Sequence, residues 1–191
     1  MMIFADYKVA ILISLGLFLI FGSILYWTSQ PLICECGYIK FWYANPVGSG
    51  NSQHIADWYT FSHVIHGFIF YWIAWLIGRK RGWPVWFMLL LALGIEMGWE
   101  LFENSNFIID RYRSATVSKE YFGDSVLNSV SDVLAMVIGF IIAWRLPAWL
   151  TVLILVGLEL YVGYMIRDNL TLNIIMLIYP AEFILRWQQG A

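Results

Sequence analysis

Long apolar runs, each bounded by polar or basic residues, follow one another along most of the chain. A helix needs about 20 predominantly apolar residues to cross the hydrocarbon core of a bilayer. Runs of about that length cover residues 9–27, 58–77, 83–103, 125–144, 148–166 and 170–187. The pattern predicts an all-α fold, a polytopic transmembrane helical bundle of about six spans. It forms a single domain over residues 1–191.

Two of these apolar runs differ from an ordinary span. Residues 9–27 resemble the core of a signal peptide, but no A-x-A cleavage site follows, so we expect this segment to be retained as a span. Residues 170–187 form the weakest span, because Asn173 and Pro180 interrupt the apolar run.

The composition supports a membrane protein. Hydrophobic residues make up 61% of the chain and charged residues 13%, whereas soluble domains average about 45–50% and about 25%. The net charge of −2 gives no basic surface for nucleic acid, so the lipid bilayer is the expected partner.

Lys and Arg near the span ends indicate the orientation, because cytoplasmic loops are enriched in both. The numbers of Lys and Arg residues on the two sides of the membrane are nearly even. However, Arg79, Lys80 and Arg81 form a compact cluster between the second and third spans. A short basic hairpin resists translocation, so we predict a cytoplasmic N-terminus.

Three acids enter the outer half of the third span, within GIEMGWELFEN. Glu96, Glu100 and Glu103 are spaced by four and three residues, which places them on one helical face. A charge near the bilayer centre costs about 3 kcal/mol or more, so such acids normally face the bundle interior. Glu103 is near enough to the headgroups to be a simple interfacial residue, whereas Glu96 and Glu100 lie deeper.

The neighbouring spans carry matching polar faces. The second span holds His63 and His66, and the fourth holds Asp124, Asn128 and Asp132 in one stripe. Successive spans run in opposite directions, so these groups and the glutamates meet at one end of the bundle and line a pocket that we expect to open at the outer surface of the membrane. Ser131, Ala135 and Gly139 continue the stripe as a small-residue ridge that favours close helix approach.

This convergence suggests roles for the acids and the histidines. We predict Glu100, Asp132, Glu96, Glu103 and Asp124 as acid/base groups or metal ligands. Asp124 has a structural alternative as the N-cap of the fourth span. His63 and His66 are candidate ligands of a divalent metal, although a membrane histidine is more often a satisfied core residue.

A second set of residues suggests substrate binding. Arg111, Arg113 and Arg167, with Asn104 and Asn128, are candidates for gripping an anionic or lipid-linked substrate. Arginines at a membrane edge more commonly extend to lipid phosphates, so this alternative stays open.

The two cysteines, Cys34 and Cys36, form a C-x-C pair. Side chains two residues apart diverge along the chain, so we expect structural thiols without a local disulfide.

Several stretches carry a family resemblance, among them NPVGSGNSQHIADWYTFSHVIHG, GWELFENSNFIIDRYRSATVS and YFGDSVLNSVSD. Over residues 43–187 the chain resembles an uncharacterised family of bacterial integral membrane proteins. The resemblance implies an inner-membrane location and brings no assigned activity. The order of a membrane histidine, a Glu-rich helix end and Asp-x-x-x-Asn is also similar to VanZ-like membrane proteins.

Three functions fit these observations. The first is a membrane-embedded enzyme acting on a phosphorylated or lipid-linked substrate. The second is a structural or assembly factor in which the polar cluster ties helices together. The third is a proton-coupled transporter, for which Glu159 in the fifth span is the one residue that extends a polar path inward.

Overall fold

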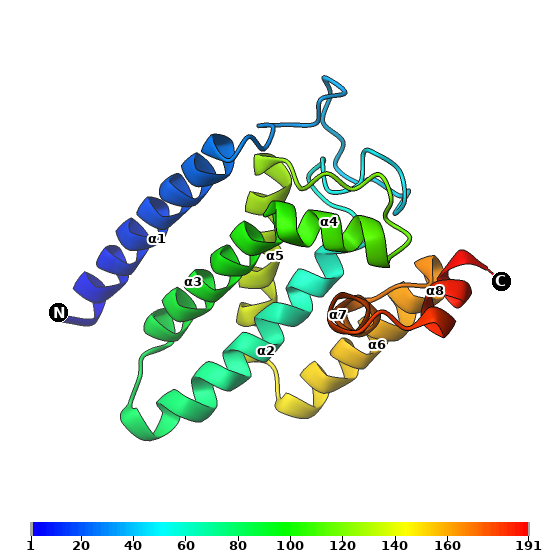
Figure 1. Ribbon diagram of the computed structural model, residues 1–191. Helices are drawn as coiled ribbons and strands as arrows, with labels where there is room; N and C mark the ends of the chain where they lie inside the picture. Colours follow the sequence, from blue (N-terminus) through cyan, green and yellow to red (C-terminus); the bar gives the residue numbers. More distant parts are fainter. Residues whose placement is uncertain (1, 191) are drawn as a thin grey trace.

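Five long apolar helices build the protein, whose computed structural model describes residues 2–190 (Figure 1). They are α1 (Met2–Trp27), α2 (Thr60–Gly78), α3 (Val85–Glu103), α5 (Val126–Arg145) and α6 (Ala148–Ile166). All five are long and apolar enough to cross a membrane. The predicted all-α transmembrane bundle is therefore confirmed.

Three shorter helices complete the fold: α4 (Asn106–Ala115), α7 (Leu170–Ile178) and α8 (Glu182–Gln189). α4 lies between the predicted spans 83–103 and 125–144, where the apolar pattern predicts no span. The sequence predicts a sixth span at 170–187, but the structure has two short helices there, α7 and α8. The helix ends at Ile178, before Pro180, and the nine residues of α7 extend about 14 Å, less than half of a bilayer core of about 30 Å.

The closest helix pair is α2 with α5, and two glycines permit the approach. A Cβ atom on Gly67 would lie 2.1 Å from the carbonyl oxygen of Met136, and one on Gly139 would lie 2.1 Å from the carbonyl oxygen of Val64. The predicted small-residue ridge thus does face a neighbouring helix, with Ala135 buried on the same side. This contact fixes the relative position of the polar residues on the two helices.

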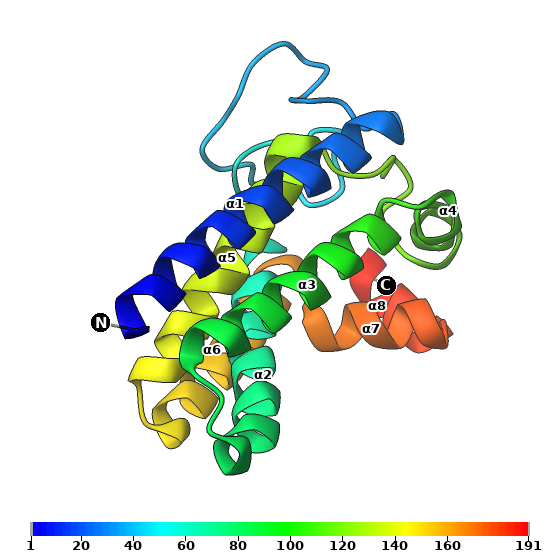
Figure 2. The same ribbon diagram turned by 90° about the vertical axis from the view of Figure 1, so that its left-hand side faces the viewer.

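One end of the bundle carries an additional layer. α2 and α5 begin and α3 ends at this end, which we call the polar end (Figure 1). The loop of residues 28–59 and helix α4 lie there, as the turned view also shows (Figure 2). Backbone hydrogen bonds attach the loop to α5, from Val126 to Pro31 and from Ser125 to Ser52. The side-chain amide of Asn128 donates to the carbonyl oxygen of His54 at 2.9 Å.

The same loop contains a disulfide between Cys34 and Cys36. The expectation of unpaired thiols was wrong, because the backbone turns at these residues and brings the two sulfur atoms together. Gly37, at φ 80°, supplies a left-handed residue directly after the pair.

Candidate functional site

His63 is the centre of the polar cluster. It lies one turn into α2, and its Nδ1 atom is 2.6 Å from Oε1 of Glu96 on α3. His66, one turn further along α2, places its own Nδ1 atom 3.0 Å from Oε2 of the same carboxylate. Glu96 therefore orients both imidazoles, and it is fully buried.

The other ring nitrogen of His63 points to a different acid. Nε2 lies 3.9 Å from Oδ2 of Asp132 on α5. Oδ1 of Asp132 accepts a hydrogen bond of 3.0 Å from the Thr60 hydroxyl, which fixes the carboxylate. With Glu96 on Nδ1, the free Nε2 atom and an unshared Asp132 oxygen face each other. Two ligands of one metal ion, each about 2.0–2.2 Å from it, are separated by a distance of this order.

Glu100 is buried beneath this pair without a hydrogen bond. Its side chain is fully buried, and neither carboxylate oxygen has a hydrogen-bond partner among residues 2–190. Oε1 lies 3.4 Å from Nδ1 of His63, but that nitrogen already bonds Glu96. A buried carboxylate with no partner is costly, so a proton or a nearby cation must neutralise it.

A small polar cavity, which we call the chamber, adjoins His63 and has a volume of about 30 Å³. It has room for an ion or for one or two waters. Carboxyl groups of Glu103, Asp124 and Asp132 line it together with His63. Three tyrosines complete much of the wall, namely Tyr59, Tyr112 and Tyr121. No lysine or arginine of the described chain lines the chamber.

A larger cavity, the groove, joins the chamber from the side of the bundle. Its volume is about 370 Å³, and it lies between α2, α3 and α7. Apolar side chains such as Phe70, Ile95 and Ile174 form most of it, and Ile95 and Ile174 are exposed on the outer face of their helices. The two cavities share five wall residues, namely Tyr59, His63, Glu103, Tyr112 and Asn173. An apolar passage from the lipid-facing surface therefore ends at the polar cluster.

Asp124 is buried at the polar end, just before α5. Burial, with a smaller contribution from the charge of Glu103, raises its pKa to about 7. Its carboxylate accepts hydrogen bonds from Asn104 Nδ2 at 3.2 Å and from the Tyr121 hydroxyl at 3.0 Å. The N-cap interpretation of Asp124 is wrong, since Ser125 is the N-cap and accepts from the backbone N–H of Asn128.

Asp168 holds the turn between α6 and α7 against the start of α2. It accepts a hydrogen bond of 3.0 Å from the Tyr59 hydroxyl. Burial raises the pKa of Asp168 to about 6, and burial together with this acid raises the pKa of Tyr59.

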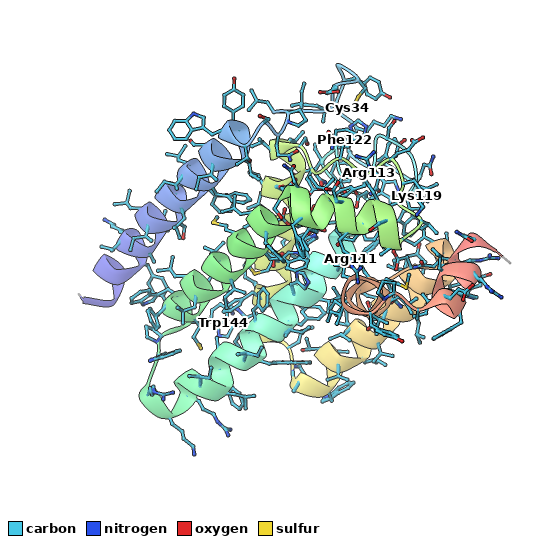
Figure 3. The ribbon with its side chains drawn as sticks, in the orientation of Figure 1. Cys34, Arg111, Arg113, Lys119, Phe122 and Trp144 are labelled. Carbon is cyan, nitrogen blue, oxygen red and sulfur yellow. A yellow bond between two sulfur atoms is a disulfide. The ribbon has the colours of Figure 1, made fainter. Side chains whose placement is uncertain are left out.

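The predicted substrate-binding arginines do not meet the acids. Arg111 donates from Nε to the carbonyl oxygen of Leu177 at 2.8 Å and so caps the C-terminal end of α7. Arg113 is exposed on α4 (Figure 3). Arg167 follows α6 and donates to the carbonyl oxygen of Trp187. All three lie outside the walls of the chamber and the groove.

The two predicted asparagines also have structural partners. Asn104 joins the end of α3 to the segment before α5, because its Oδ1 atom accepts from the backbone N–H of Asp124 at 2.6 Å. Asn128 holds the loop of residues 28–59, as described above. Both remain next to the cluster without lining either cavity.

Sequence reasoning missed the tyrosines and Asn173. The Tyr112 hydroxyl lies 2.8 Å from Glu103 Oε1 and 2.9 Å from Asn173 Oδ1, so it connects α3, α4 and α7. No spacing in the sequence distinguishes these tyrosines from those expected at a membrane interface. The one sequence signal for these residues is Asn173, a polar residue within an apolar run. The hydropathy pattern explains it only as an interruption of a span.

The fold and the buried carboxylate–histidine cluster define a multi-pass membrane protein. The family described as "Protein of unknown function (DUF2585)" matches residues 25–190, and the chain belongs to this family. A UPF0314 protein of Rhizobium meliloti (strain 1021) is 56% identical over 158 residues, which is 83% of this chain and 79% of that protein.

Further relatives cover more of the chain, and they too are bacterial. A UPF0314 protein of Agrobacterium fabrum is 51% identical over 178 residues, which is 93% of this chain and 89% of the relative. A UPF0314 protein of Brucella anthropi is 52% identical over 179 residues, or 94% and 90% of the two chains. No solved structure matches the chain.

Proposed function

We propose that this protein is a membrane-embedded, divalent-metal-dependent enzyme that acts on a lipid-linked substrate at the periplasmic side of the inner membrane. The observation that carries the proposal is the arrangement of His63. Glu96 binds one ring nitrogen, and the other faces Asp132 across 3.9 Å. A carboxylate that orients a histidine whose second nitrogen binds a metal is a recurrent arrangement in metalloenzymes.

The charges of the cluster favour a cation over an anion. Five carboxyl groups surround only two imidazoles, and neither cavity has lysine or arginine in its described wall. Even two protonated imidazoles leave acids that need a positive partner. His63 and Asp132 are the ligands we assign first, since they face each other across 3.9 Å and both line the chamber. A bound divalent ion would supply a Lewis acid and a water of lowered pKa.

The residues around the ion would then have different roles. Glu96 keeps the proton of His63 on Nδ1 and leaves Nε2 free for the ion. Asp124 lies in the chamber wall, where its carboxyl group could take up and release a proton. Glu100, fully buried beside His63, balances the charge of the site.

The groove indicates the substrate class. It brings an apolar chain from the lipid-facing surface to the same His63 and Glu103 that line the chamber. A substrate with a lipid chain in the groove and a polar group at the chamber fits both cavities. A phosphorylated headgroup would reach the site through the metal ion, because Arg111, Arg113 and Arg167 lie elsewhere. The predicted likeness to VanZ-like proteins stays a prediction from residue order.

Two observations support a periplasmic location of the polar end. The basic cluster Arg79–Arg81 lies at the opposite end of α2, where a cytoplasmic loop is expected. The Cys34–Cys36 disulfide lies in the loop at the polar end, and disulfides persist in oxidising compartments. Both favour the cytoplasmic N-terminus predicted from the sequence.

The transporter alternative loses its main support. Glu159, the residue that was to extend a polar path inward, accepts hydrogen bonds from the backbone N–H groups of Leu170 and Thr171, each at 3.1 Å. It therefore caps the N-terminal end of α7. The assembly-factor alternative makes a different prediction for the variants below.

The test compares Asp132→Asn and His63→Gln with the wild type and with Glu120→Gln, an exposed acid outside both cavities. Purified proteins are incubated with zinc or manganese, washed and assayed for bound metal by mass spectrometry. Lipid extracts of a deletion strain carrying each variant are then compared. We expect one equivalent of metal in the wild type and in Glu120→Gln, and none in the two site variants.

The two site variants should also accumulate the same lipid species as the deletion strain while keeping the wild-type circular dichroism spectrum. Folded variants that lack metal but restore the wild-type lipid profile contradict the enzyme. Variants that all fail to fold or to reach the membrane favour the assembly factor.

A further inference from the structure

A third cavity, separate from the chamber and the groove, lies in the outer loop layer. Its volume is about 310 Å³, and Cys34, Cys36, Tyr38, Tyr43, His54 and Phe122 are among its wall residues. None of its wall residues belongs to either of the other cavities. Figure 3 labels Cys34 and Phe122 at the upper end of the molecule, away from Trp144 at the other end of the bundle.

The two sulfur atoms of the disulfide differ in accessibility. Cys34 is buried, with 5% of its surface exposed, whereas Cys36 is exposed. A thiolate attacks the sulfur atom of a disulfide that it can reach, and exposed disulfides are reduced more easily than buried ones. Attack is therefore directed to Cys36, and Cys34 is the sulfur that leaves.

His54 is placed to stabilise the leaving thiolate. One of its ring nitrogens and the two sulfur atoms all lie within 4.8 Å of one another. Nδ1 accepts the backbone N–H of Lys40 at 3.3 Å, so the ring proton is on Nε2. Nε2 is buried and has no hydrogen-bond partner among residues 2–190, in a side chain that is 1% exposed. A buried N–H donor without an acceptor is unusual, and a thiolate would satisfy it.

Neighbouring groups fix this histidine and add positive charge. The ring stacks on Tyr38, with centroids 5.6 Å apart, and packs against Tyr43 at 5.2 Å. Lys40 Nζ lies over the same two tyrosine rings, 5.3 Å and 5.2 Å from their centroids. An N–H donor beside a cysteine stabilises its thiolate, and the cation of Lys40 lies against the same two tyrosines as His54.

We propose that Cys34 and Cys36 form a redox-active disulfide that exchanges with thiols at the outer face of the membrane. The thiolate of a first thiol forms a bond to Cys36 Sγ while the Cys34–Cys36 bond breaks, and the electron pair leaves on Cys34, beside His54. A second thiol then releases Cys36. Two thiols are oxidised to one disulfide, the Cys34–Cys36 pair is reduced to two thiols, and the protons of the two thiols end on the two cysteines.

The same three residues also resemble a site for a thiophilic metal, and the hydrogen bond at His54 decides between the two readings. A metal-bound histidine normally donates from its other nitrogen to an acceptor. Nδ1 of His54 instead faces a donor, the Lys40 N–H. Exchange with thiols is therefore the role that the contacts favour.

The first experiment measures reduction of the disulfide in the folded protein. Cys34 and Cys36 are the only two cysteines of the chain, so maleimide-polyethylene glycol labelling reports on them alone. Protein in detergent is treated with reduced glutathione, quenched and compared with protein denatured beforehand in SDS. We expect no label before reduction, two labels afterwards, and reduction at least about threefold faster in the folded protein, because a leaving thiol of lower pKa leaves faster, with a rate that follows its pKa only fractionally.

Single variants test the direction of attack and the role of His54. Cys34→Ser leaves the exposed Cys36, and it should form a mixed disulfide with oxidised glutathione. Cys36→Ser leaves the buried Cys34 and should react at least about tenfold more slowly, because access limits the rate. His54→Gln should remove the advantage of the folded protein over the denatured one, while Lys119→Gln, an exposed control at the same end, keeps it.

Several results would overturn the proposal. A disulfide that resists glutathione until the protein is denatured is structural. Equal reactivity of the two single-cysteine variants contradicts attack at Cys36. Two free thiols in protein purified without reductant would show that the disulfide does not form. One equivalent of zinc bound to the reduced protein, with no exchange with thiols, would show that the residues form a metal site instead.

Discussion

Replacing Gly67 by alanine tests whether close contact of α2 with α5 holds the polar cluster together. The added Cβ atom would lie 2.1 Å from the carbonyl oxygen of Met136 and 2.5 Å from the backbone nitrogen of Phe140. Ordinary contacts of a Cβ atom begin at 3.4 Å, so the overlap exceeds 1 Å. The obstacle is backbone in both cases, and it cannot rotate away as a side chain could. The helices must therefore separate.

The magnitude follows from two opposing effects. Overpacking of a tight interior costs about 1–3 kcal/mol and occasionally more. Alanine is favoured over glycine within a helix by about 1 kcal/mol. Gly157→Ala on α6 provides the matched control, since a Cβ atom there meets nothing within 4 Å. The gain from helix propensity is common to both variants and cancels, so we expect the free energy of unfolding of Gly67→Ala to be about 1–3 kcal/mol below that of Gly157→Ala.

Unfolding is measured by titrating detergent-solubilised protein with SDS while following the helical circular dichroism signal. Separation of α2 from α5 should also move His63 away from Asp132, so Gly67→Ala is expected to lose bound metal even under conditions in which it is folded. Equal stability and equal metal content in the two glycine variants would refute the assigned role of this contact.

Three further predictions concern the polar end and α7. The pKa of Asp124 is raised by burial to about 7 in the folded protein, from about 4 in the unfolded chain. Its contribution to the free energy of unfolding is thus fully present below about pH 4 and is lost as the pH rises to about 7. Asp124→Asn should flatten the plot of unfolding free energy against pH between these values. An unchanged slope would contradict the role of Asp124. Arg111→Ala should cost about 1 kcal/mol and speed hydrogen exchange in α7, while the exposed Arg113→Ala changes both little. Ser125→Ala should cost about 1 kcal/mol through loss of the N-cap of α5, measured in the same titration.

The sequence predicts the cluster well because helical periodicity and alternating spans are enough to locate it. Glu96 and Glu100 share a face at a spacing of four residues, and span order alone places that face at the same end as His63 and Asp132. The contacts of His63 with all three acids agree with this reasoning. The catalytic and metal-binding roles of these residues stay predictions.

The arginines show where such reasoning stops. Periodicity places Arg111 at the polar end, but it does not determine the direction of a long side chain. Its partner, the carbonyl oxygen of Leu177, is 66 residues away along the chain and belongs to a helix end that the hydropathy pattern does not reveal. Hydropathy also gives a similar signal for a span and for a short apolar helix followed by a second short helix, as in α7 and α8. Pro180 was the local indication that residues 170–187 divide.

The depth of the cluster links the fold to the proposed chemistry. His63 lies three residues inside the start of α2 at Thr60, about 5 Å along the helix axis. Glu100 lies three residues before the end of α3 at Glu103, at a similar depth. Helices of this length place the boundary of the hydrocarbon core near their ends, so both residues lie about one helical turn inside it, close to the level at which the polar and apolar parts of a lipid meet. In the proposed function, a lipid chain that enters the groove from the bilayer would therefore move inward by only about one helical turn to bring its headgroup linkage to His63 and Asp132.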